Sequence, residues 1–169
     1  MIHKMVVQFS KLLGNLVPIL DKAAAHAEAK KFEVEVLLQA RLAPDQFNFI
    51  RQIQIACDTA KVAAARLADK EQEVPPHADT EQTVAELKSR INNVMAYLGT
   101  FSEADFADAA QRRITTPRWK GKWLSGEEFL LQHAIPNLNF HVITAYAILR
   151  HNGVEIGKKD FLGEMPYKE

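Results

Sequence analysis

The 169-residue sequence lacks a second cysteine, an excess of charge of either sign and a long apolar run. The single cysteine, Cys57, excludes an intrachain disulfide and fits a reducing compartment. Lys and Arg together number 21, and so do Asp and Glu, so the formal net charge is zero. A broadly basic surface is therefore excluded, and we expect no nucleic-acid binding.

Every apolar stretch falls short of the roughly 20 uninterrupted residues that a membrane helix needs. Near the N-terminus, Gln8, Ser10 and Lys11 interrupt the apolar residues that would otherwise indicate a signal peptide. We therefore expect a cytoplasmic protein without membrane contact. The sequence also lacks a Walker loop, a dinucleotide-binding glycine motif, a Gly-x-Ser-x-Gly motif and paired zinc cysteines, so the enzyme classes that these motifs mark are not indicated.

Four segments carry apolar residues spaced three and four apart, which is the period of an amphipathic helix. We predict helices over residues 6–30, 45–69, 79–98 and 126–151. Asp79–Gln82 and Ser125–Glu128 match the capping-box pattern at the starts of the last two helices, and Pro136 should bend the last one. The apolar positions of that helix include Phe140 and Ile143. In the second segment, Ile53 and Cys57 belong to a nearly heptad stripe of the kind that four-helix bundles bury. Four such helices without a convincing set of strands predict an all-α four-helix bundle, formed by one domain over residues 1–169.

Two connections between the predicted helices are long enough to permit a crossing topology. Residues 31–44 form a connector with one short helical turn, and residues 99–125 form a long irregular connection before the last helix. In the latter, Trp119 and Trp123 flank a Lys-Gly-Lys tip, which predicts a turn or small hairpin. Its basic residues could hold an anion while a tryptophan stacks on a ligand. We favour the alternative, in which the tryptophans cover the end of the bundle and the charges stay in water.

The last predicted helix carries His133, Asn137 and His141 at intervals of four. Each interval is about one helical turn plus 40°, so the three side chains lie along nearly the same side of the helix, among apolar residues. Gln54 and Asp58 are also four apart, on the second helix. If these two helices are neighbours, the side chains could converge on a ligand pocket in the bundle core, with His141 in its polar floor. The alternative is that the histidines bond neighbouring segments and that the second-helix pair is solvated.

The stretch HVITAYAILRHNG, which begins at His141, resembles the last helix of DinB-like proteins. That helix commonly reads H-x-x-x-H, with an Arg nine residues after the second His and then a Gly. Arg150 and Gly153 match this pattern, and His141 takes the place of the second histidine. Asn137 stands at the place of the first histidine. The third histidine of the pattern belongs on the second helix, and the matching region, residues 52–58, holds none.

The resemblance implies a DinB-like bundle from a domain-of-unknown-function branch of that superfamily. Its members include metal-dependent hydrolases and thiol-dependent transferases, in which a divalent ion on three histidines activates water or a thiol. Asn is a poor transition-metal ligand, so we expect the metal site to be largely lost. We expect no cofactor beyond a weakly held divalent metal on His141.

The function that we expect is the binding of a small molecule in an inter-helix pocket near His141. Two alternatives stay open. One is a metal-dependent hydrolase or thiol-dependent transferase of the DinB-like superfamily, and the other is a non-catalytic dimerising or interaction module. By analogy with other bundles, which pair through an apolar helix face, we also expect a homodimer.

Overall fold

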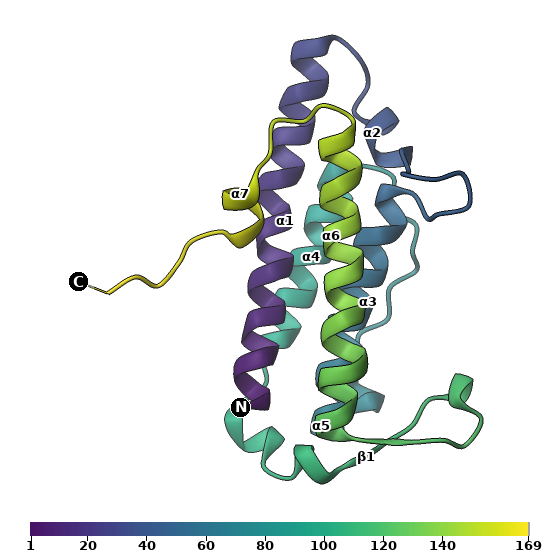
Figure 1. Ribbon diagram of the computed structural model, residues 1–169, viewed down its shortest axis with the longest axis vertical. Coiled ribbons are helices and arrows are strands. Elements are labelled where there is room, and N and C mark those ends of the chain that lie inside the picture. The colour runs from purple at the N-terminus through teal and green to yellow at the C-terminus, as the bar shows by residue number, and fades with distance from the viewer. Residues whose placement is uncertain (169) are drawn as a thin grey trace.

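The computed structural model describes residues 1–168 and confirms the all-α prediction (Figure 1). Glu169, the last residue of the expected domain, lies outside the described residues. No helix in the described part of the chain is both long enough and apolar enough to cross a membrane. The four long helices are α1 (Ile2–Lys30), α3 (Phe49–Ala68), α4 (Val84–Leu98) and α6 (Ile135–His151).

Short elements occupy the connections. The expected helical turn after the first long helix is α2 (Glu35–Gln39). Strand β1 (Arg113–Ile114) pairs antiparallel with β2 (Leu124–Ser125), which confirms the small hairpin around the two tryptophans. The remaining elements are η1 (Glu71–Glu73), η2 (Glu103–Phe106), η3 (Ala109–Gln111), η4 (Pro117–Trp119), α5 (Gly126–Phe129), the π turn η5 (Leu130–Ala134) and α7 (Lys158–Leu162).

Helix α3 packs against both α4 and α6, and α1 packs against α4. The second and last of the predicted helices are therefore neighbours, as the predicted pocket requires. Helices α3 and α4 run in the same direction, so the connection between them, residues 69–83, returns along α3 (Figure 1). We call it the crossover segment. The connection that crosses the bundle is thus the crossover segment. It is neither of the two connections that are predicted to be long enough to cross, residues 31–44 and 99–125.

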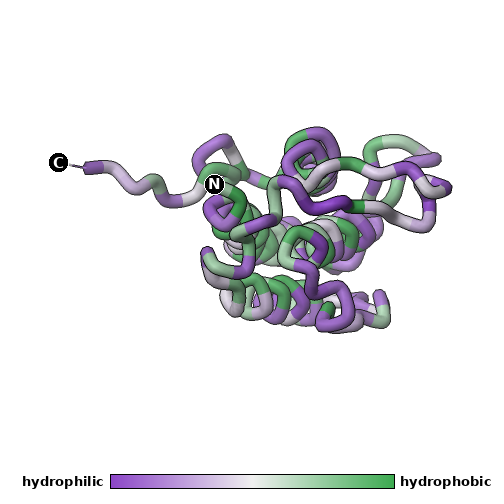
Figure 2. The backbone as a smooth tube through the Cα atoms, turned by 90° about the horizontal axis from the view of Figure 1, so that it is seen from below, coloured by the Kyte–Doolittle hydropathy of each residue, from purple (hydrophilic) through white to green (hydrophobic). Residues whose placement is uncertain are grey.

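The predicted stripes on α3 and α4 form the core. Ile53, Cys57 and Ala60 of α3 are fully buried, as are Leu87 and Ile91 of α4. In the end-on view of Figure 2, hydrophobic and hydrophilic residues alternate around the long helices. Such alternation at the helical period places one apolar side of each helix against its neighbours.

The starts of α3 and α4 differ from the prediction. Helix α3 begins after Asn48, whose side chain accepts a hydrogen bond from the Arg51 amide at 3.0 Å, and not at residue 45. For α4, Thr83 and Glu86 form the capping box, four residues beyond the pair expected from the sequence. In both stretches several polar side chains precede the helix, and only one of them reaches the free amides of the first turn.

The last helix buries only some of its expected apolar positions. Phe140 and Ile143, which the spacing assigns to the apolar side, are 55% and 50% exposed. The buried positions include Leu138, His141 and Ala145, which are three and four residues apart. Apolar residues lie on nearly every side of α6, so their spacing alone does not select the side that faces α3. His141 therefore lies on the core-facing stripe.

The expected bend at Pro136 takes the form of a π turn. The helix continues from α5 through η5 into α6, but η5 has the wider π geometry. A proline lacks the amide proton and its ring crowds the carbonyl four residues earlier, which here belongs to Gln132 within the π turn. Such turns inside α-helices are frequent at functional sites, and this one carries His133.

Candidate functional site

His141 lies between α6 and α3 and is 7% exposed. Its Nδ1 is 2.7 Å from Oε1 of Gln52, so the ring N–H donates to the amide oxygen. Burial, followed by the positive charge of Arg51, lowers the pKa of His141, so the imidazole is neutral at pH 7. The partner of His141 is therefore a carboxamide of the second long helix, but it is Gln52 and not Gln54.

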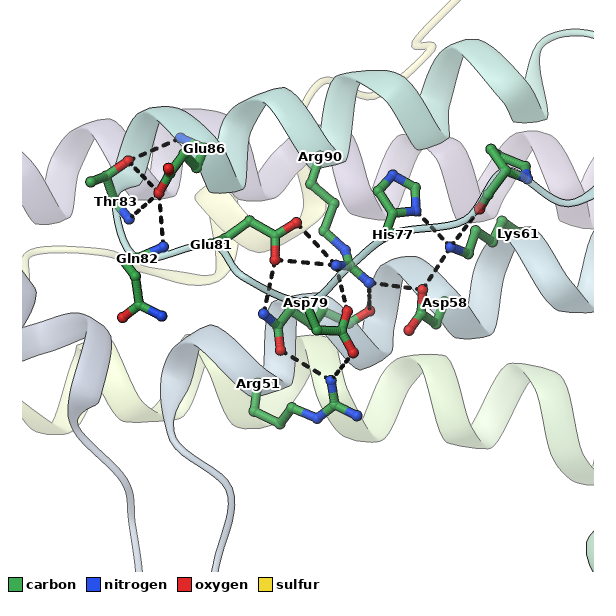
Figure 3. A network of polar contacts seen from close by, with 12 residues as sticks. Arg51, Asp58, Lys61, His77, Asp79, Glu81, Gln82, Thr83, Glu86 and Arg90 are labelled. Carbon is green, nitrogen blue, oxygen red and sulfur yellow. Dashed lines mark hydrogen bonds and ion pairs between the residues drawn. The ribbon is translucent and has the colours of Figure 1, made fainter.

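Gln54 bonds to the crossover segment, and Asp58 faces Arg90 of α4 (Figure 3). Nε2 of Gln54 donates to Glu81 at 2.9 Å, and Asp58 accepts from Arg90 at 2.8 Å. Residues two apart on a helix differ by about 200° in direction, so Gln54 cannot share the face that Gln52 turns to His141. The expected convergence of Gln54 and Asp58 with Asn137 and His141 is therefore wrong as a set of four.

Arg90 is the centre of the polar network that holds the crossover segment (Figure 3). Its side chain is 1% exposed and its guanidinium contacts Asp58, Asp79 and Glu81 at 2.8, 2.6 and 3.0 Å. Asp79 also pairs with Arg51. The sequence does contain a signal for this residue, because Arg90 lies three residues after Leu87 and four before Val94, on the buried stripe of α4.

Lys61 attaches the other end of the crossover segment. Its ammonium group donates to the Pro75 carbonyl at 3.0 Å and to Nδ1 of His77 at 2.6 Å. It also pairs with Asp58 at 2.9 Å. Lys61 and Arg90 thus share the Asp58 carboxylate and draw the crossover segment onto α3 and α4. This network accounts for Asp58 and Gln54 in structural terms.

The stability that the network carboxylates contribute depends on pH, because they must be ionised to pair with the arginines. Burial alone would raise the pKa of Asp79, but hydrogen bonds from Arg51 and Arg90 outweigh it and hold the pKa below its usual value. Burial also opposes the ionised form of Glu81, but its hydrogen bonds, including those with Gln54 and Arg90, lower the pKa. A carboxylate with a depressed folded-state pKa stabilises the fold above its unfolded-state pKa. That contribution is lost as the pH falls through the folded-state value.

We predict that Asp79→Asn lowers the free energy of unfolding at about pH 6, and that its difference from the wild type shrinks toward about pH 3 as Asp79 of the wild type protonates. The substitution keeps the positive φ of 56° at this residue, which Asn tolerates. Urea denaturation at a series of pH values measures the difference. A difference that stays constant over this range would contradict the pairing of Asp79 with Arg90.

A pocket of about 410 Å³ opens beside the network, between α3, the π turn and the 116–119 loop of the hairpin. We call it the hairpin pocket. Three of the five candidate residues line it, namely Asp58, His133 and Asn137, whereas Gln54 and His141 do not. The full lining is Asp58, Thr59, Val62, Ala63, Arg66, Thr116, Pro117, Arg118, Trp119, Phe129, His133, Ala134 and Asn137.

His133 belongs to an aromatic wall of this pocket. Its ring stacks on Phe129 at 5.3 Å and meets Trp119 edge-on at 5.5 Å. Burial and the charge of Arg66 lower its pKa, so the ring is neutral at pH 7. Nδ1 is buried and has no hydrogen-bond partner among the described residues. The protein therefore positions this imidazole by packing, and no side chain of residues 1–168 forms a hydrogen bond with it.

The two tryptophans of the hairpin have different roles. Trp119 lines the pocket, whereas Trp123 is 52% exposed and lies under the guanidinium of Arg113. The preferred sequence interpretation, in which both rings cover the bundle, is therefore wrong for Trp123. The two arginines of the hairpin differ in the same respect, because Arg118 lines the pocket and Arg113 does not.

The residues at the place that the resemblance assigns to a metal do not fit a three-histidine centre. Nδ1 of His141 is bonded to Gln52, and Nδ2 of Asn137 donates to the Thr59 hydroxyl at 2.9 Å. One imidazole with neutral amide and hydroxyl groups is a poor donor set for a transition metal. Within residues 1–168, no group of three or more His, Cys, Asp or Glu side chains is placed to hold a metal ion.

Comparison with known proteins places this geometry in a family. The sequence matches the family model of a domain of unknown function, DUF1993, over residues 1–162. The structure is similar to the crystal structure of a DinB family member protein from Shewanella denitrificans, with 63% identity and a TM-score of 0.95. That similarity covers 97% of this chain and 92% of the other. No curated protein matches the chain. The chain therefore belongs to the DUF1993 family and has a DinB-like, all-α bundle fold.

Proposed function

We propose that this protein binds a small organic molecule in the hairpin pocket. The observation that carries the proposal is His133, whose neutral ring forms part of the pocket wall while Nδ1 has no partner in the described chain. A buried polar atom without a partner costs about 1–3 kcal/mol. Such atoms are few in native proteins, and each calls for an explanation, such as strain, function or a bound molecule or ion.

The neighbouring polar groups support the same conclusion. Thr59 and Asn137 are bonded to each other across α3 and α6, and both line the pocket. An apolar cavity with a few fixed polar groups is the usual form of a small-molecule site, and its volume of about 410 Å³ lies in the usual range. The proposed site is centred on His133, one helical turn before Asn137 and two before His141. His141 supports it by holding α6 to α3 through Gln52.

We predict that Val62→Phe weakens ligand binding by at least about tenfold, because Val62 is a half-buried residue of the pocket lining and a phenyl ring there occupies ligand volume. The measurement is ¹H–¹⁵N NMR of the full chain, titrated with small planar compounds such as naphthoate, naphthamide and indole. Shifts are expected at Thr59, His133 and Asn137.

The matched control is Val7→Phe, which makes the same change at an exposed position on α1, outside the pocket lining. This variant is expected to bind as the wild type does. If no compound in the set binds at millimolar concentration, or if the shifts map to another surface, the proposed function is wrong.

A further inference from the structure

We infer that the hairpin pocket selects a planar aromatic carboxylate. The inference rests on the proposed function and adds the chemical class of the ligand. It is carried by two arginines, Arg66 and Arg118, that line the same cavity as the aromatic wall of Trp119, Phe129 and His133.

The charge that the pocket presents to a ligand is positive. Asp58 is the one carboxylate in the lining, and its oxygen is already paired with Lys61 at 2.9 Å and with Arg90 at 2.8 Å. Arg118 has no carboxylate partner in the part of the chain that the structure describes. An anion entering the pocket therefore meets an arginine whose charge no acidic side chain balances.

Only one edge of the Arg66 guanidinium is paired within the described residues. Its Nε donates to Glu71 at 2.7 Å, and Glu71 is largely exposed at the surface. That contact uses one edge of the guanidinium, and the terminal NH₂ groups make no hydrogen bond to residues 1–168. A guanidinium offers five donors in a planar fork that matches a carboxylate, so Arg66 retains donors for a ligand.

The aromatic wall selects the shape of the ligand. Trp119 contacts both Phe129 and His133 at ring-centroid distances of 6.2 and 5.5 Å, so three rings border one side of the cavity. Flat ligands gain from offset-stacked or edge-on contacts with such rings. Since His133 is half-buried and neutral, it extends this wall without adding a cation. The ligand that matches both features is a flat ring with a carboxylate directed at Arg66 and Arg118.

The test compares 2-naphthoate with 2-naphthamide, which have the same ring and differ in charge. Calorimetric titration of the full chain is expected to show naphthoate binding about tenfold more tightly than naphthamide, since hydrogen bonds to charged groups are the stronger ones. In Arg118→Gln this preference is expected to fall to about twofold or less. Arg118 is exposed and makes no ion pair with residues 1–168, so the variant is expected to fold.

Arg113→Gln is the matched control, because it removes the same charge from an exposed arginine of the hairpin that lies outside the pocket lining. It is expected to keep the full preference. Equal binding of the two compounds by the wild type overturns the inference and leaves the proposed function standing. Loss of the preference in both variants also overturns the inference, because the effect would be one of general charge. Failure of both compounds to bind overturns the inference, and it overturns the proposed function as well if indole also fails to bind.

Discussion

Arg90→Met is expected to lower the free energy of unfolding by about 3–5 kcal/mol, the cost of breaking a buried ion pair by removing one partner. Met retains the apolar stem but leaves three carboxylates, Asp58, Asp79 and Glu81, without the cation that they share. The loss is measured by urea denaturation at pH 7. Relative to the wild type, the variant should show a larger increase in the rate of hydrogen exchange in the crossover segment than in α1. The reason is that this segment depends most directly on the network.

Lys88→Met is the control for this variant. Lys88 also lies on α4 and pairs with Asp21 at 2.6 Å, but both side chains are substantially exposed. Exposed ion pairs contribute about 0–1 kcal/mol, so the expected loss is correspondingly small. If Arg90→Met costs no more than Lys88→Met, the crossover segment is held by other contacts and the network is not a main source of stability.

Ile53→Ala is expected to cost about 2–5 kcal/mol, the range for truncating a fully buried aliphatic side chain. Ile53 is fully buried on the stripe of α3 that forms the core, and Ile91 on α4 is equally buried, so the same loss is expected there. Thermal and urea unfolding measure the change.

The matched control is Ile143→Ala on α6, where the side chain is 50% exposed and the expected change is within about 0.5 kcal/mol. This pair of variants distinguishes the observed stripe of α6 from the stripe that spacing predicts. A loss at Ile143 comparable with that at Ile53 would mean that this face of α6 is covered in solution. Such a result would agree with the predicted homodimer, which stays a prediction.

Much of the fold follows from local pattern. The helical period of α3 and α4 predicts their buried residues, and the Ser125–Glu128 capping box predicts the start of the last helix. The Trp-Lys-Gly-Lys-Trp stretch predicts the hairpin. These features depend on residues within a few positions of one another, so short sequence patterns are sufficient to predict them.

The candidate site is predicted less well. Asp58, His133 and Asn137 do line one pocket. Arg66, Thr59 and Trp119 complete it, and no pattern in the sequence groups these three residues. Arg66 and Trp119 are 53 positions apart in the chain. Their meeting depends on how the hairpin folds back over α3, and helical periodicity carries no information about that.

By itself, the sequence determined the helical class, the long helices, the stripes of α3 and α4 and the resemblance to DinB-like proteins. Only the tertiary structure decided which side of α6 faces α3, where the crossover segment runs and which polar groups therefore meet. The physical reason is that periodicity describes each helix about its own axis. The rotation of one helix relative to another is set by packing between residues distant in sequence, and that rotation turns Gln52, rather than Gln54, toward His141.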